Sequence, residues 1–185
     1  MTVHVAATEP YAWPYDGRLH AAELALVLAG WDATWRSRAV GADAAGAAHA
    51  EQRCLQLADA VAGCGGLVIA VAHADAPPLP LPGARSVPVP GIDALHGSPI
   101  DAILRRSGRS HVLVAGHGLE APVHSTLRSA NDRGYECLLV TDASSTLQAD
   151  LAGAAVKTVC MSGGIFGAVG ASADVLDALP PPIAP

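Results

Sequence analysis

The chain has 185 residues, which suits one domain with a full core and is short for two. Its 17 acidic residues outnumber the 11 basic ones, for a formal net charge of -6, and this balance argues against a partner made of nucleic acid. No segment approaches the roughly 18 consecutive apolar residues that cross a bilayer, and the N-terminus lacks the order of an export signal, so we expect a cytoplasmic protein without membrane contact.

The first half of the chain predicts two buried strands and one long helix. An extended N-terminal arm rich in proline and aromatic residues covers 1–20, and an apolar run of strand length follows at 24–29. Helical spacing runs from 44 to 62 and ends at glycines, before a second apolar run at 67–72. Residues 77–98 are predicted to be an irregular crossing, because the six prolines in this stretch exclude a central strand.

The second half alternates helices with strands. We predict helices at residues 100–106, 122–133, 147–155 and 167–179, strands at 111–115, 136–140 and 158–161, and a proline-rich tail at 180–185. Strands that alternate with helices indicate an α/β fold, a three-layer, Rossmann-like arrangement in which helices cover both faces of a mostly parallel sheet. Ligands bind beyond the carboxyl ends of such strands, where Gly30, His73 and residues 116–121 would gather.

Three motifs in the second half carry a family resemblance: Val-His-Ser-Thr at 123–126, Ala-Asn-Asp-Arg-Gly-Tyr-Glu-Cys-Leu-Leu at 130–139, and Gly-Gly-Ile-Phe-Gly-Ala-Val at 163–169. They resemble those of the isochorismatase-like cysteine hydrolases, in particular the ureidoacrylate and biuret amidohydrolase branch. The lead-in at 11–17 is similar too. The resemblance implies one isochorismatase-like domain over residues 1–185, a homo-oligomer (dimer or tetramer), and hydrolysis by an Asp, a Lys and a Cys whose thiolate forms a covalent intermediate.

This chain departs from that family pattern at all three catalytic positions. The resemblance places Gly30 at the acid, Ile92 at the lysine and Pro122 at the nucleophile. The only lysine in the chain is Lys157, which lies far from that register. Proline has neither a thiol nor an N–H, and losing one oxyanion donor alone costs about 3 kcal/mol in the barrier. Proline does suit the first turn of a helix, so we expect the fold to survive without thiol hydrolysis.

Polar residues remain near the same end of the predicted sheet. His117, Glu120 and His124 lie within eight residues, and three interpretations stay open: acid–base chemistry with a Glu120 pKa raised by burial and a proton shuttled by His117, a metal site, or satisfied polar groups around a helix cap. Asp32 is either a displaced carboxylate or a solvated loop acid beside Trp31 and Trp35. Another candidate nucleophile is Cys160, whereas the cysteines in general suit buried apolar positions.

Two functions therefore compete. In the first, the protein is a repurposed enzyme that acts without a covalent intermediate on a small carbonyl- or amide-bearing metabolite; in the second, it is an inactive relative that binds a ligand or stabilises a partner subunit. We expect neither a cofactor nor a metal. The predicted catalytic residues are His117, Glu120 and Asp32, and the predicted substrate-binding residues are His124, His73 and Trp31.

Overall fold

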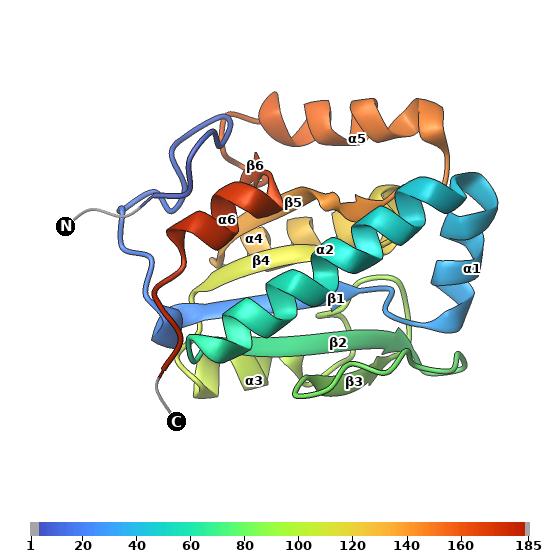
Figure 1. The fold of residues 1–185 in the computed structure, drawn as a ribbon, viewed down its shortest axis with the longest axis horizontal. Coiled ribbons are helices and arrows are strands. Elements are labelled where there is room, and N and C mark those ends of the chain that lie inside the picture. The colour runs from blue at the N-terminus through green and yellow to red at the C-terminus, as the bar shows by residue number, and fades with distance from the viewer. Residues whose placement is uncertain (1–3, 184–185) are drawn as a thin grey trace.

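The computed structural model of the chain describes residues 4–183 and is built on a six-stranded sheet (Figure 1). The strands are β1 (Leu24–Ala29), β2 (Leu67–His73), β3 (Arg85–Val89), β4 (His111–His117), β5 (Glu136–Ser145) and β6 (Ala168–Gly170). They lie in the order β3-β2-β1-β4-β5-β6, and each neighbouring pair is parallel. From β1 the sheet grows to one side through β2 and β3, and the chain then returns to add β4, β5 and β6 on the other side. The carboxyl ends of β1 and β4 therefore flank the crevice where such sheets bind ligands.

Helices cover both faces of this sheet. They are α1 (Ala33–Ala42), α2 (Ala44–Gly63), α3 (Ile100–Arg106), α4 (His124–Asp132), α5 (Ala149–Cys160) and α6 (Ser172–Ala178), with a short 3₁₀-helix η1 (Ala21–Glu23) and a π-helix η2 (Leu119–Val123). In Figure 1, α2 and α6 lie in front of the sheet, with α3 and α4 behind it. The predicted three-layer α/β fold is confirmed. None of the helices in residues 4–183 has the length and apolar content needed to span a bilayer.

The central strand β1 explains why an uninterrupted apolar run forms a parallel strand. Leu24, Leu26 and Leu28 pack in the core on the side of α2 and α6, whereas the alternating residues Ala25 and Val27 pack in the core on the side of α3 and α4. Each residue of the strand is buried. A strand that is covered on both faces needs apolar side chains at every position, as this sequence provides.

Three predicted elements need correction, and one helix was not predicted. The crossing at 77–98 contains β3, which tolerates Pro88 because β3 is an edge strand bonded only to β2. Residues 158–161 do not form a strand, since α5 continues to Cys160. The helix predicted from 167 begins only at Ser172, after β6. Helix α1 was not predicted, because Ala39 is its only buried residue and no apolar face marks it.

The two ends of the chain pack against the domain. In the arm, Val5 and Trp13 are buried, and Glu9 exchanges backbone hydrogen bonds with Val169 of β6. In the tail, the Ile183 N–H donates to the Gly63 carbonyl at the end of α2. The outermost parts of the predicted arm and tail, 1–3 and 184–185, lie outside the described residues.

Candidate functional site

The carboxyl ends of β1 and β4 bring two of the three predicted triad positions together. Gly30 follows β1 with a φ of 63°, a left-handed conformation that favours glycine. A Cβ at Gly30 would lie 2.5 Å from the carbonyl oxygen of His117 and 3.1 Å from Cγ of Pro122. Gly30 and Pro122 are therefore neighbours, and the backbone at Gly30 leaves no room for a side chain.

The third position lies in the loop between β3 and α3. Ile92 is 48% exposed there. The loop is tied to α4, since the N–H of Ala94 donates to Oγ1 of Thr126 over 3.1 Å. An apolar, partly exposed side chain at this position offers no positive charge to a substrate.

The indole of Trp35 occupies the space beside Pro122. Its Cγ lies 3.2 Å from the position that a Cβ on Gly30 would take, and its Cε3 lies 3.3 Å from the corresponding position on Gly118. The guanidinium of Arg38 covers the ring, 4.8 Å from its centroid. The position that the resemblance assigns to the nucleophile is therefore buried and packed among apolar side chains. Sequence reasoning placed Trp35 near Asp32 but did not predict its packing beside Pro122, because it did not predict α1.

Asp32 holds the start of α1 in place. Its Oδ1 accepts hydrogen bonds from the N–H groups of Thr34 and Trp35, both at 2.9 Å, and its Oδ2 accepts from the His73 N–H at 3.0 Å. The residue is fully buried, so the interpretation as a solvated loop acid is wrong. The carboxylate is the N-cap of α1 and links this helix to the end of β2. The sequence could have indicated this role, because Asp32 directly precedes Ala33-Thr34-Trp35 and aspartate is a favoured N-cap residue.

The buried His117 side chain lies in the core on the side of α2. Its ring stacks on Trp31 with a centroid separation of 5.3 Å, and its Nδ1 lies 2.9 Å from Oγ of Ser145. Its Nε2 is buried and has no hydrogen-bond partner among residues 4–183. Burial lowers the pKa of His117, so the ring stays neutral near pH 7. A buried, neutral ring does not suit the proton shuttle that we predicted.

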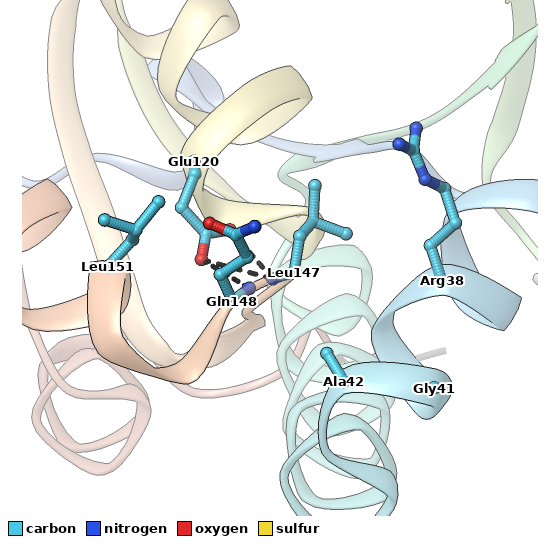
Figure 2. Close-up of a pocket in the computed structure, with 7 residues that line it drawn as sticks. All are labelled: Arg38, Gly41, Ala42, Glu120, Leu147, Gln148 and Leu151. Atoms are coloured by element: carbon cyan, nitrogen blue, oxygen red, sulfur yellow. Dashed lines mark hydrogen bonds between the residues drawn. The ribbon is translucent and has the colours of Figure 1, made fainter.

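Glu120 clamps η2 to the segment that precedes α5 (Figure 2). The carboxylate accepts hydrogen bonds from the N–H groups of Leu147 at 2.9 Å and Gln148 at 3.1 Å, and from the hydroxyl of Thr146. Burial by itself would raise the pKa of Glu120, but these hydrogen bonds lower it overall. The predicted increase in its pKa is therefore wrong. Glu120 is an ionised carboxylate whose oxygens already accept hydrogen bonds from three residues.

The other predicted binding residues do not share one site, since His73 lines a hollow of about 300 Å³ with Thr34 and Trp35, whereas His124 does not line it. His124 is half-buried, its Nδ1 accepts a hydrogen bond from Nε of Arg128 at 3.1 Å, and burial followed by the Arg128 charge lowers its pKa. His73 accepts from the Asp75 N–H through Nδ1, at 3.3 Å, within its own turn. Across residues 4–183, no three His, Cys, Asp or Glu side chains lie close enough together to share a metal ion.

A hollow of about 500 Å³ opens next to the clamp. In Figure 2, Arg38 and Ala42 of α1 stand on one side of it, and Glu120 and Leu151 on the other. It does not reach the cysteines. Cys54, Cys64 and Cys137 are buried, as predicted, and Cys160 is partly so. Burial raises the pKa of Cys54, Cys137 and Cys160, which keeps these thiols protonated.

Comparison with known proteins places the chain in a family. The isochorismatase domain matches residues 70–169, more than half of the sequence, and includes β4, η2 and Pro122. The chain belongs to the isochorismatase family. The matched segment contains the strand-to-helix junction at which Pro122 stands.

Solved structures share the fold of this isochorismatase-family member at low sequence identity. A cysteine hydrolase from Pseudomonas syringae pv. phaseolicola superposes with a TM-score of 0.74 at 16% identity, covering 86% of this chain and 93% of that one. The YcaC gene product of Escherichia coli, an octameric hydrolase, gives 0.70 at 21%, covering 88% and 81%. The nicotinamidase of Staphylococcus aureus gives 0.66 at 14%, covering 80% and 98%. At these identities the likeness establishes the fold alone.

Proposed function

We propose that this isochorismatase-family protein has lost thiol hydrolysis and serves as a non-catalytic member that binds a ligand or stabilises a partner subunit. The observation that carries the proposal is the packing around Pro122: the side chain lies against Gly30 and Gly118, and the Trp35 indole fills the adjoining space. The three motifs at 123–126, 130–139 and 163–169 support descent from the ureidoacrylate and biuret amidohydrolase branch.

The chemistry of covalent hydrolysis supports the same conclusion. The reaction needs a thiolate, a group that moves protons, and donors for the developing oxyanion. Pro122 supplies neither sulfur nor N–H, Gly30 has no side chain, and Ile92 carries no charge. The cysteines elsewhere in the chain do not replace the thiolate, since burial raises the pKa of Cys54, Cys137 and Cys160.

A repurposed acid–base enzyme is the second candidate, and the buried Nε2 of His117, which lacks a partner among the described residues, is the observation in its favour. Such an enzyme requires an acid and a base that face one substrate. Here His117 is closed off behind Trp31, the Glu120 carboxylate is engaged by Leu147 and Gln148, and Asp32 caps α1. This arrangement favours binding over catalysis.

The direct test is an assay for hydrolysis and for the acyl intermediate. The purified protein is incubated with ureidoacrylate, biuret and nicotinamide, with the S. aureus nicotinamidase acting on nicotinamide as the positive control. Ammonia release and the intact mass are followed. We expect no turnover above the buffer rate and no mass increase. Turnover accompanied by an acyl adduct, both abolished by iodoacetamide, would overturn the proposal.

We also propose that the protein works as a homo-oligomer. The octameric state of the E. coli YcaC gene product, which shares the fold, supports this assembly. Exposed apolar side chains at Tyr15, Met161 and Ile165 provide surface that assembly would bury. Sedimentation equilibrium tests the state directly, and a monomer at all concentrations would contradict it.

A further inference from the structure

A hollow of about 300 Å³ lies between β3 and α3, at the amino end of the sheet. Leu67 and Arg85, the first residues of β2 and β3, form one side of it. Arg106, the last residue of α3, and Ser107 lie on the other side. In Figure 1, α3 and β3 lie side by side below β2. Two segments that are far apart in the sequence therefore meet around one small space.

The floor of this hollow is apolar. It consists of Leu67, Pro99, Ala102 and Ile103. Leu67 and Ile103 are partly buried and pack against the core on the side of α3 and α4. A floor of this kind suits a short hydrocarbon group, because contact with the floor removes apolar surface from water.

The charged side chains that line the hollow are all positive. They are Arg85 and Arg106, both exposed, and no carboxylate lines the hollow with them. Asp101, the acid of α3, is engaged elsewhere: it accepts hydrogen bonds from Nε of Arg105 at 3.1 Å and from the Tyr135 hydroxyl at 2.8 Å. Within residues 4–183, neither Arg85 nor Arg106 has an ion-pair or side-chain hydrogen-bond partner. The hollow therefore carries two uncompensated positive charges.

The end of α3 does not by itself account for these charges. Free carbonyl groups and the helix dipole attract cations to the last turn, where Arg106 lies. However, the carbonyl of Ile103 already accepts hydrogen bonds from the N–H and the hydroxyl of Ser107. Arg85 belongs to β3, where there is no helix end to neutralise. The two full positive charges also exceed the negative end of the dipole, which equals about half a charge.

We propose that this hollow binds a small organic phosphate monoester, whose phosphate contacts Arg85 and Arg106 while its hydrocarbon part lies on the apolar floor. Guanidinium groups recognise phosphate oxygens through paired hydrogen bonds. A phosphate monoester carries about 1.5 to 2 negative charges near pH 7, which matches the two arginines. The volume of the hollow is at the lower end of the range for ligand pockets, so the ligand is small.

This site is separate from the triad positions. Gly30 and Pro122 lie beyond the carboxyl ends of β1 and β4, whereas the hollow lies where β2 and β3 begin. Because the strands are parallel, the two places are at opposite ends of the sheet. The inference therefore goes beyond the function proposed above and does not depend on the loss of hydrolysis.

Phenyl phosphate is a suitable probe, because it joins a phosphate group to a compact apolar ring. Isothermal titration calorimetry compares it with benzoate, which has one charge, and with inorganic phosphate, which has no ring. We expect phenyl phosphate to bind about fivefold more tightly than either. Raising the salt concentration from about 20 to about 200 mM should weaken its binding about threefold, since salt screens exposed charges. Equal affinities for phenyl phosphate and benzoate would refute a site for a phosphate monoester.

Three variants locate the site. Arg85→Gln and Arg106→Gln should each weaken phenyl phosphate about fivefold, because each removes one of the two charges. Ala102→Leu should fill the floor, weaken phenyl phosphate and leave inorganic phosphate unchanged, with little effect on the helix. Arg18→Gln is the matched control, since it removes the same charge from an exposed arginine that does not line the hollow. Undiminished binding of phenyl phosphate by the double variant Arg85→Gln/Arg106→Gln overturns the proposal.

Chemical modification tests the same contacts in the unaltered protein. Phenylglyoxal reacts with accessible guanidinium groups, so phenyl phosphate should slow the modification of Arg85 and Arg106 and not that of Arg18, as read by peptide mass spectrometry. Equal protection of all three would refute a specific site. If a second copy of the chain covers the hollow, Arg85 and Arg106 react slowly without any ligand and phenyl phosphate changes nothing, which also refutes it. Protection in a protein that forms the acyl adduct of the hydrolysis assay would refute only the loss of hydrolysis.

Discussion

Two glycines allow the apolar cluster around Pro122 to close. Gly30 and Gly118 have φ values of 63° and 84°, and the Cβ that either residue lacks would point at Pro122 and Trp35. The absent side chains let the indole approach the backbone directly. An aspartate at position 30 does not fit this backbone, because its Cβ would lie 2.5 Å from the carbonyl oxygen of His117 at the end of β4.

Gly30→Ala should destabilise the protein strongly. The added Cβ would lie 2.5 Å from the His117 carbonyl oxygen, and alanine at a positive φ is itself strained, so we expect a loss of about 2–3 kcal/mol in the free energy of unfolding. Urea denaturation followed by circular dichroism measures it. Gly41→Ala, in the open interior of α1, should instead stabilise by about 0.5–1 kcal/mol. Equal effects of the two substitutions would show that the cluster is loosely packed.

The predicted site assumed that residues close in the sequence share one site in the structure, and this assumption failed for His117, Glu120 and His124. The meeting of Gly30 and Pro122 follows from the order of parallel strands, and the structure places the two residues together. His117, Glu120 and His124 are close in sequence, yet a strand sends the first into the α2 side of the core and η2 turns the second toward Thr146. Residues that are adjacent in sequence can face different ways where a strand ends in a turn. No pattern in the sequence predicted the turn from β4 into η2.

At the scale of elements, the contacts that fix α5 are few, and Glu120 makes several of them. The carboxylate accepts hydrogen bonds from the N–H groups of Leu147 and Gln148, just before the helix, and from the hydroxyl of Thr146. Because Val159 is the only buried residue of α5, these bonds hold its start to η2. The clamp therefore fixes the start of α5 relative to η2.

Glu120→Ala should loosen this helix and lower stability. We expect a loss of about 2 kcal/mol, typical of hydrogen bonds to a charged group, together with faster amide hydrogen exchange across 149–156. Since hydrogen bonding lowers the pKa of Glu120, its contribution is complete above the unfolded value of about 4.3 and disappears as the pH falls through the folded value. Asp59→Ala, an exposed acid on α2, is the control. Unchanged exchange in α5 would contradict the clamp.

The helices and strands that were predicted best are those whose own sequence shows a clear pattern of apolar residues. The bounds predicted for β1 and α3 are those of the structure. A continuous apolar run marks β1, and the buried pair Ile100 and Leu104 marks one side of α3. Helix α1 buries only Ala39, and its one sequence mark is the Asp32 cap. Strand β6 has three residues and exists through pairing with Leu138–Val140, a partner that no local pattern reveals. Short elements that depend on tertiary pairing were therefore missed.

At the scale of the whole molecule, buried histidines link folding to pH. His117 is surrounded by the core and by charges from three elements: Glu51 on α2, Arg36 on α1 and the Asp32 cap. Burial dominates and lowers its pKa, and His124 is shifted in the same direction by burial and by Arg128. The folded state therefore binds fewer protons than the unfolded state at mildly acidic pH.

The sign of the resulting pH dependence is definite. A base whose pKa is lowered by folding leaves stability intact above its unfolded value, about 6.5 for histidine, and removes stability as the pH falls below it, because the unfolded chain gains protons first. We expect the free energy of unfolding from urea titrations to decrease between pH 7 and pH 5, before the Glu120 clamp begins to protonate. His117→Gln, which keeps a hydrogen-bonding group near Ser145, should flatten this slope, whereas His96→Gln on the exposed loop should not. A slope that survives the first substitution unchanged would mean that the His117 ring reaches water, and the buried packing against Trp31 would be wrong.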